Sequence, residues 1–388
     1  MFFDPDGSEV DWIVGYAPPA EDFQKQIDKV LQGVDTFKSL QALYTKDSKN
    51  IETVFKLAEK YGDRYKTDKA NELYAQVVAL DPDGKKGTAE YGRNKDKVSY
   101  TQYAEFNIGT GSLSARPPDP AALLAFIKKY PDGQIVKDAY GRLSGFYGRQ
   151  GSKEDATKFF EGYTARFPKE GQAYSGWVTR ILLDKDPVDK GLDLAQKAIS
   201  LAQGRMAMTG YQNLARLYLL KGDKDKAVEA ADQIMVLAAA PPPPAAKGEA
   251  VPAKPMGSPA GMSAAPQAAQ IYIDAGKPEK ALAVFGPEFV TQNANSAPVL
   301  NRYAQFWAQQ GTNLDSALAA AKMATELTPS AYGPFNILAA VYQKMKNYGE
   351  ALKAAEKALA LAPAQPPQIK DGIQKTIDSI KTEAAAKK

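Results

Sequence analysis

The sequence predicts an all-α protein, built as a superhelical solenoid of about eight helix–turn–helix units. Three observations support this fold class. Large and small apolar residues alternate at helical spacing, the pattern returns about every 35 residues, and a proline ends several units. In the clearest unit, Phe335, Leu338 and Tyr342 are followed by Ala351 and then by Pro363. Each such hairpin has an apolar face that only stacking on a neighbour buries.

Residues 1–33 do not follow this pattern. The sequence FFDPDG at residues 2–7 is typical of a strand end and a tight turn, and residues 10–16 are predicted to form the second strand of a hairpin. A helix is predicted over residues 21–31, with Phe23 and Ile27 on one face. Strand, turn, strand and helix in this order resemble the last third of a thioredoxin-like domain. The half of such a domain that carries Cys-x-x-Cys has no counterpart here, because the chain contains no cysteine.

A hairpin with one helix is marginal in water on its own. The N-terminal segment is therefore expected either to be poorly ordered or to dock on the first repeat. Docking would use its apolar side chains, which are Phe2, Trp12, Ile13, Val14 and Phe23.

The repeats follow a connector at residues 34–50. Five are predicted over residues 51–237 and three over residues 262–363. They begin at or near Ile51, Tyr100, Lys137, Gln172, Met208, Met262, Ala297 and Tyr332. Two longer gaps between starts indicate insertions near residues 85–99 and 238–261.

Small residues recur at two positions of each unit, where the paired helices approach closely. A leucine in place of Ala227 or Ala351 is expected to overpack this contact, at a cost of about 1–3 kcal/mol. A glycine recurs between the two helices, where a left-handed conformation is commonly needed. These glycines are Gly151, Gly222, Gly276 and Gly311.

Two segments flank the last three repeats. Residues 238–261 are rich in alanine and proline, with four consecutive prolines at Pro241–Pro244, and they are interpreted as a flexible linker. The alternative is a proline-motif ligand. Residues 364–388 are predicted to form an amphipathic capping helix, with Ile369, Ile373, Ile377 and Ile380 on one side.

The repeated unit resembles the tetratricopeptide repeat, a helix–turn–helix of about 34 residues. The whole layout resembles bacterial thioredoxin–tetratricopeptide fusion proteins with the front removed. In such arrays the first helix of each pair lines a concave groove. The resemblance implies groove residues at Arg149, Arg180, Gln212, Arg216, Asn301, Gln305, Asn336 and Gln343. Their side chains suit a peptide backbone or a carboxylate; the alternative for each is plain solvated surface. The Lys and Asn set of the family's two-carboxylate clamp is absent, so chaperone C-terminal tails are not expected partners.

Composition excludes several functions. The chain has no cysteine and no histidine, which removes thiol nucleophiles, thiolate metal sites and imidazole chemistry. No catalytic, cofactor-binding or metal-binding residue is predicted, and the chain is not expected to be an enzyme. A net charge of +4 without a basic block gives no nucleic-acid footprint. No apolar run approaches the roughly 18 residues of a membrane span.

Three motifs are interpreted as turns. The two DPDG sequences, at residues 4–7 and 81–84, lack the ligand spacing of a calcium loop. The sequence GTGS at residues 109–112 lacks the ending of a phosphate loop, and it is expected to form a helix-ending turn inside the second repeat.

The predicted function is a non-catalytic scaffold that binds a peptide or protein partner in the groove. One alternative is a truncated thiol–disulfide oxidoreductase whose Cys-x-x-Cys half is missing. Another is a component of a bacterial envelope assembly. The start lacks the features of a signal peptide. A cytoplasmic location is expected if Met1 is the native start, and a periplasmic or envelope location if an upstream signal peptide has been lost. The partner's identity and the oligomeric state stay open.

Overall fold

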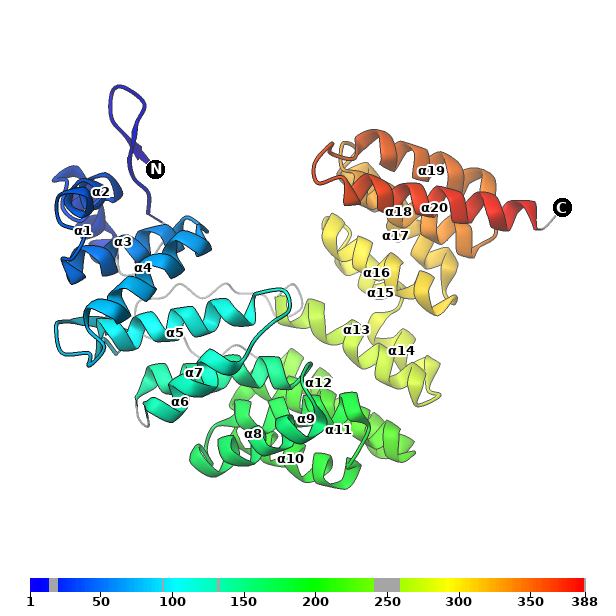
Figure 1. Ribbon diagram of the computed structural model, residues 1–388. Helices are drawn as coiled ribbons and strands as arrows, with labels where there is room; N and C mark the ends of the chain where they lie inside the picture. Colours follow the sequence, from blue (N-terminus) through cyan, green and yellow to red (C-terminus); the bar gives the residue numbers. More distant parts are fainter. Residues whose placement is uncertain (14–19, 93, 131–132, 241–258, 387–388) are drawn as a thin grey trace. The chain divides into compact units, whose positions relative to one another are not determined.

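The computed structural model describes residues 1–13, 20–92, 94–130, 133–240 and 259–386 (Figure 1). Helices make up most of the described chain, and two short β-hairpins lie in its N-terminal part. The chain divides into two compact units, Met1–Pro168 and Lys169–Lys388. The first unit contains both hairpins.

The first unit begins with a hairpin and two helices. Strand β1 (Phe2–Phe3) pairs antiparallel with β2 (Glu9–Asp11), and α1 (Ala20–Leu31) and α2 (Phe37–Lys46) follow. The predicted order of strand, turn, strand and helix is therefore observed. The second strand ends at Asp11, short of the predicted residues 10–16, of which residues 14–16 lie outside the described residues. Helix α2 lies in the segment interpreted as a connector, and the side chain of Thr36 caps its start by accepting from the Ser39 backbone N–H.

The N-terminal segment docks on the first repeat through charge as well as apolar contact. Arg64 ends helix α3 (Ile51–Asp63) and is only 8% exposed. Its Nε donates to Glu9 Oε1 at 2.8 Å and its Nη2 to Asp11 Oδ1 at 2.9 Å. The guanidinium group lies 3.9 Å from the centre of the Phe37 ring. The predicted apolar contacts are secondary, since the four that are described, Phe2, Trp12, Ile13 and Phe23, are only partly buried. Val14 lies outside the described residues.

Helical hairpins fill the rest of the first unit. Its further elements are α4 (Thr67–Leu80), β3 (Thr88–Tyr91), β4 (Asp96–Ser99), α5 (Tyr100–Leu113), α6 (Ala121–Lys129), α7 (Gln134–Tyr147) and α8 (Lys153–Arg166). The insertion predicted near residues 85–99 contains the antiparallel hairpin β3–β4, which the repeat pattern did not predict. Helix α3 packs on α4, α5 on α6, and α7 on α8.

Residues 109–112 correct a sequence prediction. They were expected to form a turn, and they lie inside helix α5. Gly109 is buried there, and a Cβ on it would meet Leu123 Cγ of α6 at 2.8 Å. The glycine therefore serves the close approach of two helices and does not end one.

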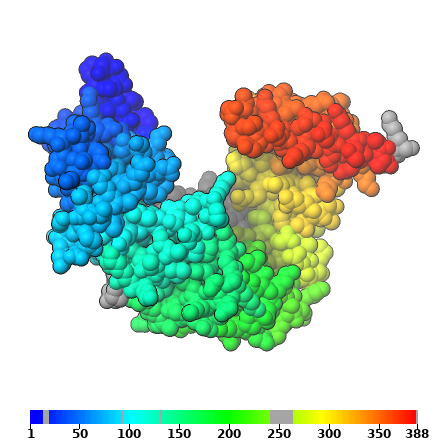
Figure 2. All heavy atoms as spheres, viewed as in Figure 1, coloured from blue at the N-terminus to red at the C-terminus, as the bar shows by residue number. Residues whose placement is uncertain are grey.

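The second unit is a succession of helical hairpins (Figure 1). Its α-helices are α9 (Gly171–Asp184), α10 (Val188–Leu201), α11 (Ala207–Lys221), α12 (Lys224–Ala239), α13 (Pro259–Asp274), α14 (Pro278–Phe285), α15 (Pro287–Gln292), α16 (Ala297–Gln310), α17 (Leu314–Leu327), α18 (Tyr332–Lys344), α19 (Tyr348–Leu361) and α20 (Gln368–Ala385). The first helices α9, α11, α13, α16 and α18 contact one another in succession. The atoms of α16–α20, yellow to red, form one packed body (Figure 2).

Small residues hold the hairpins of this unit together. Ala227 and Ala351 are fully buried, as the repeat pattern predicts. Trp307 is also buried, and its Nε1 donates to the Phe285 carbonyl at 2.8 Å. Gly222 and Gly311 end α11 and α16 with φ of +86° and +69°, the left-handed conformation predicted for them.

The ends of the predicted linker are helical. Helix α12 runs to Ala239 and α13 begins at Pro259, so the segment is shorter than the predicted 238–261, and residues 241–258 lie outside the described residues. The two helices contact each other directly. Asp232 of α12 accepts hydrogen bonds from the Tyr272 hydroxyl at 2.6 Å and from Lys280 Nζ at 2.9 Å.

Candidate functional site

The residues predicted to line a groove occupy different surroundings. Arg149 lies in the turn after α7, exposed, and belongs to the first unit. Arg180 of α9 is only 6% exposed, and its Nε donates to Asp184 Oδ2 at 2.7 Å. Arg149 is therefore off the predicted helix face, and the charge of Arg180 is neutralised inside the protein, where it is not available to a partner.

The remaining predicted residues lie on first helices of the second unit. Gln212 is partly buried and Arg216, one turn later on α11, is exposed. On α16, Asn301 is partly buried and Gln305, one turn later, is exposed. Gln343 of α18 is engaged by the C-terminal helix, because its Nε2 donates to Ser379 Oγ at 3.1 Å and to Glu383 Oε1 at 2.6 Å.

Asn301 and Asn336 form a matched pair. They occupy the same repeat position on α16 and α18, which contact each other. The side-chain oxygen Oδ1 of each is shielded from solvent and has no hydrogen-bond partner among the described residues. An unsatisfied buried acceptor costs about 1–3 kcal/mol. Both oxygens therefore have acceptor capacity that the described residues do not use.

The same row of first helices carries a further polar contact. Gln310 Nε2 of α16 donates to Gln270 Oε1 of α13 at 2.7 Å. Amide side chains thus occur on α13, α16 and α18, which contact one another in succession. Because an amide both donates and accepts, such a row matches a partner's backbone groups.

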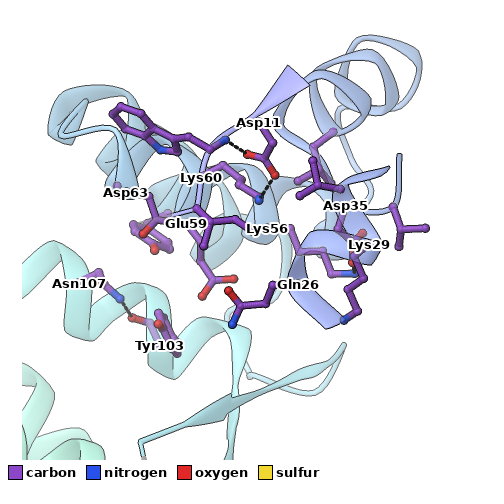
Figure 3. Close-up of a pocket in the computed structure, with 17 residues that line it drawn as sticks. Asp11, Gln26, Lys29, Asp35, Lys56, Glu59, Lys60, Asp63, Tyr103 and Asn107 are labelled. Carbon is purple, nitrogen blue, oxygen red and sulfur yellow. Dashed lines mark hydrogen bonds and ion pairs between the residues drawn. The ribbon is translucent and has the colours of Figure 1, made fainter. Parts of the chain in front are cut away.

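A second candidate site, which the sequence did not indicate, is a pocket of about 730 Å³ in the first unit (Figure 3). Residues from β2 and α1 form one side of it, and residues from α3, α4 and α5 form the other. Its polar and charged lining is Asp11, Gln26, Lys29, Asp35, Lys56, Glu59, Lys60, Asp63, Tyr74, Tyr103 and Asn107.

Two lysines of the pocket are already paired. Lys60 forms an ion pair with Asp11. Lys56 pairs with Asp35 at 2.9 Å and with Glu52 at 2.8 Å. These pairs cancel charge inside the pocket lining.

Glu59 and Asp63 lie one turn apart on α3 and take part in no ion pair among the described residues. Glu59 is partly buried, and in Figure 3 its carboxylate points into the pocket toward Gln26. Burial raises the pKa of Glu59 to about 7, although a hydrogen bond from Tyr103 opposes this shift. Asp63 is more exposed, and partial desolvation raises its pKa as well.

The comparisons with family models bear on the helical hairpins. Residues 209–235 and residues 334–365 match models of the tetratricopeptide repeat. The first match falls on α11–α12 and the second on α18–α19. Both hairpins are therefore tetratricopeptide repeats, and the chain contains this repeat. Neither match reaches residues 1–33, so the resemblance of that segment to a thioredoxin-like domain has no support from them.

Several solved structures are similar to this chain. One is YrrB, described as a TPR protein with an unusual peptide-binding site; it is 17% identical, with 56% of this chain and 97% of that chain covered and a TM-score of 0.29. A repeat protein from Parabacteroides merdae is 11% identical, with coverage of 72% and 99% and a TM-score of 0.41. The Cut9–Hcn1 structure is 13% identical, with coverage of 91% and 59% and a TM-score of 0.36. No curated protein matches the chain.

Two further findings concern the described residues alone. No helix among them combines the length and the apolar character that a membrane crossing requires. No cluster of three or more acidic, histidine or cysteine side chains in the same ranges is placed to hold a metal ion.

Proposed function

We propose that this protein is a non-catalytic scaffold that binds an extended peptide or protein segment on the first-helix face of its second unit, centred on α16 and α18. Tetratricopeptide repeats mediate binding to proteins and peptides. In this proposal the repeats cover residues 51–237 and 262–363, and residues 364–388 cap them. The observation that carries the proposal is the pair of unsatisfied side-chain oxygens on Asn301 and Asn336.

The spacing of the pair suits an extended chain. Packed helices lie about 8–10 Å apart, and an extended chain rises about 3.3 Å per residue. Two asparagines on neighbouring helices therefore meet backbone groups about three residues apart. The partner's N–H groups would satisfy the two oxygens, and each side-chain NH₂ would donate to a partner carbonyl.

The exposed side chains around the pair extend the binding face. Gln305 offers a further amide on α16, and Arg216 offers a guanidinium group on α11 that suits a carboxylate. Arg180 and Gln343 are left out of the proposed face, because Asp184 and helix α20 already engage them.

The test uses the full chain and a displayed library of random peptides. A selected peptide is synthesised, and its affinity is measured by calorimetry against the wild type and against the double variant Asn301→Ala with Asn336→Ala. We expect binding to weaken by about tenfold or more, since each lost hydrogen bond contributes about 0.5–1.5 kcal/mol.

A matched control comes from the second helix of the same hairpin. Lys322 and Glu326 are exposed on α17, and their double alanine variant is expected to bind like the wild type. Circular dichroism establishes that both variants keep their helices. Undiminished binding by the asparagine variant, or equal loss in the α17 control, would refute the proposed face.

A further inference from the structure

The pocket of the first unit is a separate feature from the proposed peptide face. It belongs to residues 1–168, whereas the asparagine pair belongs to the second unit. Its volume of about 730 Å³ falls within the range of ligand pockets, about 300–1,000 Å³. An inference about it therefore does not rest on the proposed function.

The charged side chains that line the pocket sum to a net negative charge. Lys60 is matched by Asp11, and Lys56 by Asp35. Arg64, beside Asp63, is held by Glu9 and Asp11. Lys29 of α1 also lines the pocket, with an exposed side chain. Glu59 and Asp63 are the lining carboxylates that no cation pairs with among the described residues.

Placing a carboxylate in partly buried surroundings costs free energy unless a cation pairs with it. The raised pKa of Glu59 expresses that cost, and the opposing effects of Lys56 and Lys60 do not cancel it. The phenol of Tyr103 donates one hydrogen bond to Glu59, which leaves further acceptor capacity on the carboxylate. Tyr74 also lines the pocket, and burial raises the pKa of its phenol further above neutral pH.

The remaining walls suit an alkyl chain that ends in a positive charge. Val30 and Leu40 contribute apolar surface, and Trp12, Tyr74 and Tyr103 contribute aromatic rings, which attract cations. The Trp12 indole Nε1 has no hydrogen-bond partner and no solvent contact in the described residues.

We propose that this pocket binds an organic cation, an alkylammonium or guanidinium group that pairs with Glu59 and Asp63 while its carbon chain lies along Val30 and Leu40. A bare metal ion is disfavoured, because the described side chains contain no cluster placed to ligate one. The cation has two sources with the same chemistry, a free amine or a lysine or arginine side chain of a peptide.

The experiment offers both sources to the full chain by calorimetry. The free cation is agmatine, and the peptide is N-acetyl-Gly-Gly-Arg-Gly-Gly-amide, with the same peptide carrying Gln for Arg as the neutral control. We expect the Arg peptide or agmatine to bind and the Gln peptide not to bind. Binding of agmatine and the Arg peptide alike indicates that the cation suffices, and binding of the Arg peptide alone indicates that peptide groups contribute. Both of these outcomes support the site.

The variant Glu59→Gln should weaken cation binding by about tenfold or more at pH 8, because it removes a charge-assisted contact. Glu72→Gln is the matched control, since Glu72 is exposed on α4 and does not line this pocket. The asparagine double variant of the second unit should bind the cation normally, which separates this test from that of the proposed function.

Binding should also depend on pH. The carboxylate form of Glu59 is the one that pairs, and its pKa is about 7, so wild-type affinity should be about tenfold weaker at pH 6 than at pH 8. Glu59→Gln should lose most of this dependence. The proposal is overturned if neither cation binds, if binding survives Glu59→Gln unchanged, or if inorganic phosphate binds the pocket in place of the cations.

Discussion

The substitution Glu59→Gln makes the sharpest stability prediction. Desolvation raises the pKa of Glu59 from 4.5 to about 7, with a contribution from repulsion by Asp63, while Tyr103, Lys60 and Lys56 act in the opposite direction. A carboxyl group with a raised pKa keeps its proton in the folded protein. Its effect is therefore absent below about pH 4.5, and the folded state loses stability as pH rises from there to about 7. The difference between the ordinary pKa of 4.5 and the folded-state pKa of about 7 corresponds to a loss of about 3 kcal/mol in the free energy of unfolding.

Glutamine has nearly the same shape and no charge, so this penalty should disappear in the variant. At pH 8 we expect Glu59→Gln to be more stable than the wild type by up to about 3 kcal/mol, and at pH 4 the two should be equal. Hydrogen exchange of the α3 amides is the suitable assay, because repeat arrays need not unfold in one step. Comparing variants at the same pH cancels the intrinsic exchange rates. An equal difference at both pH values, or a less protected variant at pH 8, would refute the reasoning.

Two predictions concern packing and docking in the first unit. Gly109→Ala should destabilise the protein by about 1–3 kcal/mol in urea unfolding, because the new Cβ would lie 2.8 Å from Leu123 Cγ. Gly145→Ala, with nothing within 4 Å of the new Cβ, should stabilise it by up to about 1 kcal/mol. A stabilising effect of the first substitution or a destabilising effect of the second would contradict this reasoning. Asp11→Asn should weaken docking of residues 1–33 by about 1.5–3 kcal/mol, because it removes one charged partner of Arg64 while Glu9 remains paired with the guanidinium group. Limited proteolysis should then cut that segment faster, and an unchanged rate would count against the ion network as its anchor.

The repeated core was predictable because its determinants lie close together in the sequence. Ala227 and Ala351 are small and fully buried, and each packs against helices within about one repeat length. Gly222 and Gly311 adopt the left-handed turn conformation for a local reason as well. A pattern that depends only on near neighbours can be read directly from the chain.

Features that depend on one particular contact were not predictable. Gly109 lies in a sequence that is typical of a turn. Only its close contact with Leu123 shows why a glycine occupies this position inside a helix. Arg180 occupies a position that lines the groove in other arrays, yet Asp184 one turn later draws its side chain into an ion pair. The hairpin β3–β4 interrupts the repeat period, so periodicity carries no information about it.

The pocket likewise depends on contacts between residues that are far apart in the sequence. Glu59 and Asp63 alone indicate only a charged turn of a solvated helix. Their surroundings become a pocket because Gln26 and Val30 of α1 lie across from them. Asp11 of β2, which lines the pocket, is held by its anchor Arg64 at the end of α3 itself. One helix therefore carries both the carboxylates of the site and the cation that retains the opposite wall. Loss of that anchor would expose Glu59 to water and lower its pKa toward the ordinary value. We therefore expect the pocket to be lost when the N-terminal segment no longer docks.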